Sequence, residues 1–218
     1  MINIDGYQNV LKACKEKNVT LVAVSKTKPV EDIITLYNLG QKEFGENYVQ
    51  ELLEKYQQLP KDIHWHFIGH LQTNKVKQVV EFVYLIQGVD SLKLLKEINK
   101  QSEKINKITN CLLQIHIAQE ETKFGLDENE LNEIIGEFEN LKMKNVNIVG
   151  LMGMASFTND ENQIRKEFKY LKSLQQKFST VNFQLSILSM GMTADYKVAI
   201  EEGSNMIRVG SLIFGSRN

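Results

Sequence analysis

The chain has 218 residues, of which 42% are hydrophobic and 24% charged, and its formal net charge is −1. Such a composition is ordinary for a globular protein, and the near-zero charge with no basic stripe argues against a nucleic-acid partner. No apolar run approaches the ~18 residues of a membrane span, and residues 1–18 contain no apolar signal segment. The two cysteines, Cys14 and Cys111, lack metal-ligand spacing. We therefore expect a cytoplasmic protein without membrane attachment or metal.

Segments with strand and helix patterns alternate along the whole chain, without a linker or low-complexity stretch between them. After an amphipathic helix at 4–17, the patterns predict strands at 20–25, 43–45, 65–68, 83–87, 111–117, 146–152, 184–189 and 206–209. Between the strands they predict helices at 30–38, 48–57, 74–80, 92–102, 128–139, 162–178 and 194–202, with a short turn after the last strand.

This alternation decides the expected fold class. Strands that alternate with helices pair in parallel, and eight such units close into a (β/α)8 barrel. We therefore expect one α/β domain, a TIM barrel over residues 1–218. The alternative is an open doubly wound sheet, in which a glycine-rich turn is expected after the first strand. The barrel is favoured because that turn reads Ser25-Lys26-Thr27-Lys28-Pro29.

Lys26 stands where the first apolar strand runs out, shortly before Pro29 forbids the strand to continue. A lysine stem at a strand end is partly desolvated, which lowers the pKa of its ammonium group. A neutral amine is a nucleophile that condenses with aldehydes. A solvated strand-end lysine is the competing interpretation, and this stretch alone does not separate the two.

Two later strands break into small residues and hydroxyl groups, in Ser189-Met190-Gly191 and in Arg208-Val209-Gly210-Ser211. Small residues let backbone N–H groups approach an anion, so these consecutive loops indicate a phosphate site. In a barrel, the loops after strands seven and eight often bind phosphate, and strand eight adjoins strand one. An amine beside a phosphate cradle predicts a ligand with an aldehyde and a phosphate. Pyridoxal 5'-phosphate (PLP) fits that description.

Arginine is rare in this chain: only Arg165, Arg208 and Arg217 are arginines among 26 basic residues. Arg208 lies in an apolar strand, which indicates a need for the planar, permanently charged guanidinium that lysine cannot supply. A strand-end ion pair is the alternative interpretation.

His66 and Asn47 are each open to two interpretations. His66 shares a strand face with His64, but no carboxylate or cysteine joins them at ligand spacing. We expect no metal there, and a His66 that lines a ligand ring or makes a structural hydrogen bond. Asn47 follows a short strand, so it either caps the next helix or contacts a ligand, and both roles are compatible.

Several segments follow one another in a distinctive order over nearly the whole chain: 23–26, 44–51, 65–75, 123–125, 150–154, 188–192 and 208–215. Together they resemble the PLP homeostasis proteins, which are single-domain relatives of the alanine racemase barrel, fold type III of PLP proteins. The departures are small. Thr193 stands where serine is more usual, and Asn110-Cys111 opens a strand often written with valines.

The resemblance implies a PLP site in which Lys26 carries the cofactor as a Schiff base. Arg208 would face the pyridine nitrogen. Asn47, His66 and Met154 would line the pocket around the ring.

The resemblance also implies the phosphate site. Ser189, Gly210 and Ser211 would hold the phosphate, with the backbone at Met190 nearby. Lys123 is ambiguous between a cation at the edge of the site and a solvated lysine.

The expected function is that of a non-catalytic PLP-binding protein that buffers PLP and carries it to PLP-requiring apo-enzymes, as a monomer or weak homodimer. A guanidinium beside the pyridine nitrogen disfavours ring protonation and makes the ring a poor electron sink. Racemisation needs two bases, and the resembled racemases take the second from a separate domain after the barrel. We expect no such domain here, because the sequence ends at Asn218, directly after the eighth unit. An amino-acid racemase-like enzyme is the alternative. A barrel aldolase is a third, less favoured because its lysine lies on a central strand.

Overall fold

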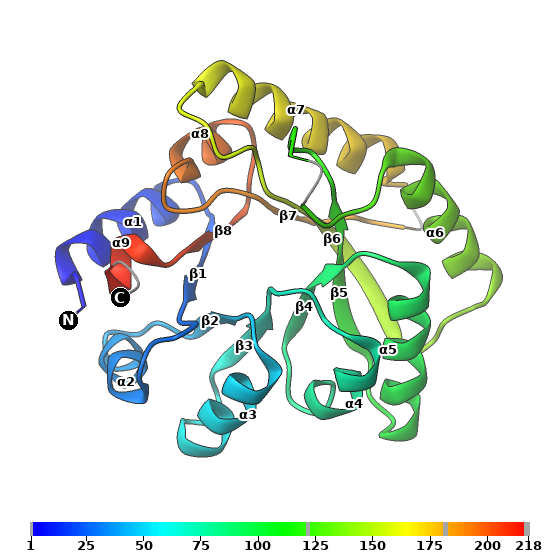
Figure 1. Ribbon diagram of the computed structural model, residues 1–218, viewed down its shortest axis with the longest axis horizontal. Coiled ribbons are helices and arrows are strands. Elements are labelled where there is room, and N and C mark those ends of the chain that lie inside the picture. Colours follow the sequence, from blue (N-terminus) through cyan, green and yellow to red (C-terminus); the bar gives the residue numbers. More distant parts are fainter. Residues whose placement is uncertain (1, 121–122, 181–182, 216–218) are drawn as a thin grey trace.

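The structure is a computed structural model that describes residues 2–120, 123–180 and 183–215. Its eight strands form a closed, all-parallel barrel in the order β1 to β8, and β8 pairs with β1 (Figure 1). This confirms the predicted (β/α)8 class. The strands are β1 (Thr20–Val24), β2 (Glu43–Glu46), β3 (His64–Phe67), β4 (Leu85–Val89), β5 (Thr109–Ile115), β6 (Val146–Gly153), β7 (Ile187–Ser189) and β8 (Met206–Val209).

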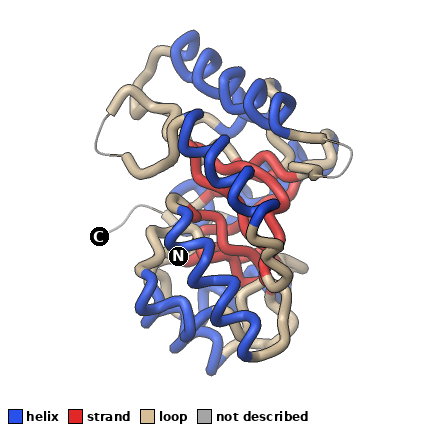
Figure 2. Tube along the Cα trace, turned by 90° about the vertical axis from the view of Figure 1, so that its right-hand side faces the viewer, coloured by secondary structure: helices blue, strands red, loops and turns tan. Residues whose placement is uncertain are grey.

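The helices lie outside the strands (Figure 2). None of those described is long and apolar enough to cross a membrane. The short 3-10 turn η1 (Thr73–Lys75) precedes α4. The helices are α1 (Ile4–Glu16), α2 (Val30–Asn38), α3 (Val49–Gln58), α4 (Val76–Val79), α5 (Leu92–Lys104), α6 (Glu128–Asn140), α7 (Glu161–Phe178), α8 (Tyr196–Glu201) and α9 (Ser211–Phe214).

Local sequence signals set several of these helix starts. The Ser91 side chain accepts the Leu94 N–H at the start of α5, and Asp160 does the same for two N–H groups of α7. α1 and α9 lie side by side, because the Asn3 N–H donates to the Ile213 carbonyl at 2.8 Å (Figure 1). The two ends of the described chain therefore meet at the seam where the barrel closes.

Three predicted strands differ from the structure by two residues or more, for reasons of backbone bonding. β4 begins two residues later than the predicted 83–87, because the Val83 N–H donates to the Val79 carbonyl. β7 is shorter than the predicted 184–189, because the N–H and carbonyl of Leu185 bond the side chains of Ser179 and Gln175. β5 lies two residues earlier than the predicted 111–117, because the His116 N–H turns away to the carbonyl of Leu126. The predicted helix at 74–80 is divided into η1 and α4, and the last turn is the helix α9.

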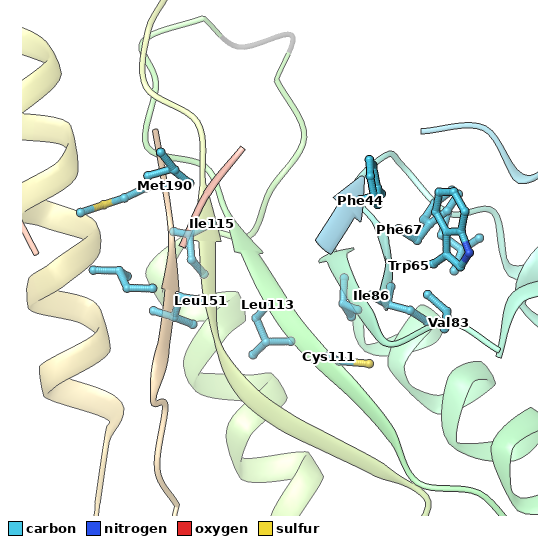
Figure 3. Close-up of a cluster of buried hydrophobic side chains, with 14 of the residues drawn as sticks. Phe44, Trp65, Phe67, Val83, Ile86, Cys111, Leu113, Ile115, Leu151 and Met190 are labelled. Carbon is cyan, nitrogen blue, oxygen red and sulfur yellow. The ribbon is translucent and has the colours of Figure 1, made fainter. Parts of the chain in front are cut away.

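Side chains alternate between the inside and outside of the barrel along each strand. Inside lies a small apolar cluster of Val22, Leu85, Leu112, Met152 and Met206. Outside, strand and helix residues form the larger core, part of which is drawn in Figure 3 with Phe44, Trp65, Phe67, Ile86, Cys111, Leu113, Ile115, Leu151 and Met190.

An irregularity in β6 changes this alternation. Cys111 pairs with Ile148, whereas the next residue pairs with Gly150, so β6 has one extra residue. As a result Ile148 and Leu151 both face the outer core, and Met152 faces the interior. Gly150 is required here, because a Cβ atom would lie 2.0 Å from the carbonyl oxygen of Ile187.

Candidate functional site

A cavity of about 670 Å³ opens at the carboxyl ends of the strands. Its described lining comes from the segments that follow β1, β3, β5, β6, β7 and β8, together with the ends of β1 and β8. It includes Lys26, Arg208, Gly210 and Ser211, which are four of the nine residues expected at one site. Barrel closure therefore brings together groups that lie at opposite ends of the sequence. This is the face on which barrel proteins place their active sites.

The cavity is positively charged. Its described charged side chains are Lys26, Lys28, Lys123, Arg208 and Asp195. Lys123 is held at the rim, since its Nζ atom donates to the Ala155 carbonyl at 2.7 Å and lies 3.1 Å from the Glu120 carboxylate. Four basic groups against one acid suit an anionic ligand. Among the described residues, no cluster of three metal-ligating side chains occurs.

Lys26 lies in a tight turn rather than at the last position of the strand. β1 ends at Val24, and the Lys28 N–H donates to the Ser25 carbonyl at 3.0 Å across the turn. Thr27, at the third position of this turn, has a φ of 64°. A β-branched residue in the left-handed region is strained and persists only where its surroundings hold it.

A buried ion cluster holds this turn. The ammonium of Lys55, which is 4% exposed, donates to the Ser25 carbonyl at 2.7 Å, to Glu46 at 2.7 Å and to Glu51 at 2.6 Å. Glu51 also accepts the Thr27 N–H at 2.6 Å, and Glu46 accepts the Ser25 hydroxyl at 2.6 Å. Burial raises the pKa of Glu46, although the charge of Lys55 opposes the shift. The cluster thus clamps the backbone on both sides of Lys26.

Arg208 extends from β8 into the floor of the cavity and is only 3% exposed. Its guanidinium donates to the Ser189 hydroxyl at 2.5 Å and to the Gly153 carbonyl at 3.0 Å. Burial lowers the pKa of Arg208 to about 10, and the charge of Asp195 partly offsets this. The guanidinium is therefore a fixed positive charge at neutral pH.

Ser189 and Met190 are not among the described residues that line the cavity. The Ser189 hydroxyl is fully buried and donates to Gln87 Oε1 at 2.7 Å while it accepts from Arg208. Met190 belongs to the outer core (Figure 3), and its N–H donates to the Met206 carbonyl at 3.1 Å. Both groups form hydrogen bonds within the protein, and their contact with a phosphate stays a prediction.

The three residues expected around the ring also lie outside the described cavity lining. His66 is fully buried between Glu43, at 2.6 Å, and Gln87, at 2.8 Å, and burial lowers its pKa. Met154 packs against the interior apolar cluster. Asn47 does not cap the next helix, since α3 begins after Tyr48 without a side-chain cap. Its buried Oδ1 has no hydrogen-bond partner in the described structure.

The loop after β7 was expected at the ligand, but the residues named there, Ser189 and Met190, are not the ones that line the cavity. Met192, Thr193, Ala194 and Asp195 line the cavity. The loop is compact because Asp195 accepts the Met192 N–H at 2.6 Å. Its start requires glycine, because a Cβ at Gly191 (φ 96°) would lie 2.5 Å from that of Ala199. The hydroxyl of Thr193 was the available signal in the sequence.

The sequence analysis did not predict the loop after β6 as part of the site. Ser156, Phe157, Thr158 and Asn159 line the cavity. Ser156 is anchored by the buried Glu167 carboxylate, which accepts both its N–H and its hydroxyl at 2.7 Å. Glu167 comes from α7, so no pattern within the loop predicts the contact.

Comparisons with known proteins identify relatives of this chain. The family described as "Alanine racemase, N-terminal domain" matches residues 5–218. The pyridoxal phosphate homeostasis protein of Aquifex aeolicus (strain VF5) is 40% identical over 218 residues, covering 96% of this chain and 94% of that protein. The human protein of the same name is 42% identical over 214 residues, covering 91% of this chain and 76% of its own length.

Solved structures show the same architecture. PipY of Synechococcus elongatus PCC7942, with PLP bound, has a TM-score of 0.82 at 33% identity, covering 91% of this chain and 93% of PipY. An alanine racemase of Clostridium difficile 630 has a TM-score of 0.76 at 16% identity, covering 99% of this chain and 58% of the racemase. The second likeness shows a shared fold and nothing about activity.

Proposed function

Because this chain belongs to the family of pyridoxal phosphate homeostasis proteins, we propose that it binds PLP as a Schiff base on Lys26. Its role is to buffer PLP inside the cell and to release it to PLP-requiring apo-enzymes, without efficient catalysis. The observation that carries the proposal is that Lys26, Gly210, Ser211 and Arg208 line the same cavity.

The residues of the cavity fit PLP in size, charge and donor chemistry. A volume of about 670 Å³ accommodates a small cofactor with room to spare. Helix α9 begins directly after Gly210, which has no side chain to cap it. The backbone N–H and the hydroxyl of Ser211, at the start of this helix, are suitable donors for the phosphate. Thr193 extends the same wall, since its hydroxyl lies 3.5 Å from the Leu212 nitrogen.

The clamp around Lys26 supports the role of the amine. PLP supplies an aldehyde that bonds an amine and a ring that withdraws electrons when its nitrogen is protonated. The ion cluster of Lys55, Glu46 and Glu51 restrains the backbone on both sides of Lys26. Restraint of this kind lowers the ordering cost of each binding event, which suits a carrier that loads and unloads repeatedly.

Arg208 supports a role without efficient catalysis. A permanently charged guanidinium at the pyridine nitrogen disfavours protonation there, because two like charges would meet in a buried site. The ring is then a weak electron sink, so proton removal at the α-carbon of an amino acid would be slow. The proposal includes a cytoplasmic location, which the two buried, unpaired cysteines support.

The absorption spectrum of the purified protein tests the cofactor. We expect a yellow protein whose chromophore disappears on borohydride reduction, with one pyridoxyl group fixed per chain. Mapping of the labelled peptide should find the group on Lys26 rather than on Lys28 or Lys123, the other lysines of the cavity. A colourless protein that takes up no PLP when it is added would refute the proposal.

Substitution of Arg208 tests whether its guanidinium keeps the pyridine nitrogen of PLP unprotonated and so slows catalysis. Wild-type protein should give at most trace racemisation of amino acids. Arg208→Glu should allow ring protonation, shift the absorption band and make its position depend on pH. The control is Arg165→Glu, since Arg165 pairs with glutamates between α7 and α8. An unchanged spectrum in Arg208→Glu would show that Arg208 does not face the ring nitrogen, and robust wild-type turnover would favour the racemase-like alternative.

A further inference from the structure

A series of hydrogen-bonded polar side chains crosses the interior of the barrel from the buried Arg208 to the partly exposed Glu43. Arg208 donates to Ser189 at 2.5 Å, and Ser189 donates to Gln87 at 2.7 Å. Gln87 Nε2 lies 2.8 Å from His66 Nδ1, and His66 Nε2 lies 2.6 Å from Glu43. Five strands contribute one residue each to this series of hydrogen bonds. The Arg208 end of the series lies at the cavity.

The donor and acceptor chemistry of Arg208 and Glu43 fixes the direction in which every hydrogen bond of this series is donated. Arginine has donors only, so the Ser189 oxygen accepts and its one hydrogen goes to Gln87 Oε1. The Gln87 amide nitrogen therefore faces His66, whose Nδ1 must accept. His66 then carries its hydrogen on Nε2 and donates it to the Glu43 carboxylate. The amide orientation and the histidine tautomer follow from the donor-only guanidinium.

The polar side chains adjoin the apolar interior cluster. Two residues earlier on the strands of Gln87 and Arg208 stand Leu85 and Met206, which belong to the apolar interior cluster. Leu85 pairs with His66 and Met206 pairs with Ser189, so the polar side chains and the apolar cluster lie side by side in the barrel interior. Buried polar groups cost free energy unless every one is satisfied, and each member from Ser189 to His66 has a partner on both sides.

We propose that Gln87 and His66 are positioning residues for Arg208: through Ser189 they fix the guanidinium in the cavity floor and link its charge to the Glu43 carboxylate. The functional consequence rests on the proposed role of Arg208 at the PLP ring nitrogen. Neither Gln87 nor His66 lines the cavity. Both act on the ligand only by restricting how Arg208 can turn.

The restriction can be measured without any ligand. The sequence has three arginines and four histidines, so protein labelled with 15N at arginine and histidine gives few side-chain signals. In the wild type we expect His66 to be protonated on Nε2 only, and the two Nη signals of Arg208 to be separate because the guanidinium rotates slowly. In Gln87→Met, which keeps the volume and removes the amide, the His66 signals should shift and the Arg208 Nη signals should merge.

PLP binding then tests the functional link. Gln87→Met should weaken PLP binding by ~5-fold or more and change the spectrum of the bound form. The control is Gln175→Met, which removes another buried glutamine that donates to the Leu185 carbonyl outside the barrel. It should leave both the Arg208 signals and the spectrum unchanged.

The outcomes are separable. If Arg208 keeps separate Nη signals in Gln87→Met, or if wild-type His66 carries its proton on Nδ1, the positioning role is wrong. If the Arg208 and His66 signals respond as expected while wild-type protein binds no PLP, the positioning role stands and the proposed function fails. Equal weakening of PLP binding by Gln87→Met and Gln175→Met, with unchanged spectra, would overturn the functional link.

Discussion

Replacing Lys26 with alanine is expected to abolish the covalent attachment of PLP. No pyridoxyl group should be fixed by borohydride, and the absorption band of the bound form should be lost. Phosphate and ring contacts remain, so weaker binding should persist. We expect an affinity loss of at least ~10-fold, which corresponds to about 1.4 kcal/mol. Equilibrium dialysis with PLP and mass spectrometry after reduction measure the two effects.

The matched control lies in the same turn. Lys28→Ala removes an amine two residues away that lines the same cavity, and it should retain the covalent modification. Lys26→Arg keeps the positive charge without a competent nucleophile, so it should behave like Lys26→Ala. A pyridoxyl group that persists in Lys26→Ala and maps to another lysine would remove Lys26 from its assigned role.

The second large effect is expected at Lys55, on the stability of the fold. Lys55→Met keeps most of the packing volume but leaves two carboxylates, Glu46 and Glu51, without their cation. Removing one partner of a buried ion pair costs about 3–5 kcal/mol. Urea unfolding followed by circular dichroism should show this loss at neutral pH. Lys42→Met, which breaks the exposed pair with Asp62, should have a far smaller effect.

The loss in Lys55→Met should depend on pH, and the sign follows from Glu46. Burial already raises the pKa of Glu46 above its ordinary value of 4.5, and without Lys55 it should rise further. A carboxyl group with a higher pKa in the folded state binds protons more tightly there, so its contribution to stability falls as pH increases. The penalty of Lys55→Met should therefore be small near pH 4.5 and grow toward neutral pH.

A second substitution checks this cause. Adding Glu46→Gln to Lys55→Met removes the uncompensated charge and should restore part of the lost stability at neutral pH. A penalty that stays constant between acidic and neutral pH, or that Glu46→Gln does not reduce, would show that lost packing rather than electrostatics explains the effect.

The order and type of the elements could be predicted from sequence because they depend on local physics. The hydrophobic pattern of consecutive residues predicts each apolar strand and each amphipathic helix. Eight such strand–helix units, paired in parallel, can close into a barrel. Barrel closure also brings Lys26 to the loop after β8, as expected. The errors at the ends of β5 and β7 arose where side chains or a distant loop took over the backbone bonds.

The contacts of the site residues were less predictable. Ser189 was expected to hold phosphate because small residues and hydroxyl groups follow an apolar strand there, and because the family resemblance implied it. In the structure its hydroxyl is shared by Arg208 and Gln87, and Gln87 lies 102 positions away in the sequence. The extra residue in β6 likewise changes which side chains face inward, and no periodicity reveals it.

By itself, the sequence determined the barrel class, the lysine after the first strand and the small residues after the last, because backbone preference and hydrophobic periodicity are local. Only the tertiary structure showed that Lys55 bonds the turn that contains Lys26, and that Arg208 donates to Ser189 at the start of a series of polar side chains. These contacts join strands and helices that are far apart in the sequence. Their geometry depends on strand register and barrel closure, which the complete fold sets.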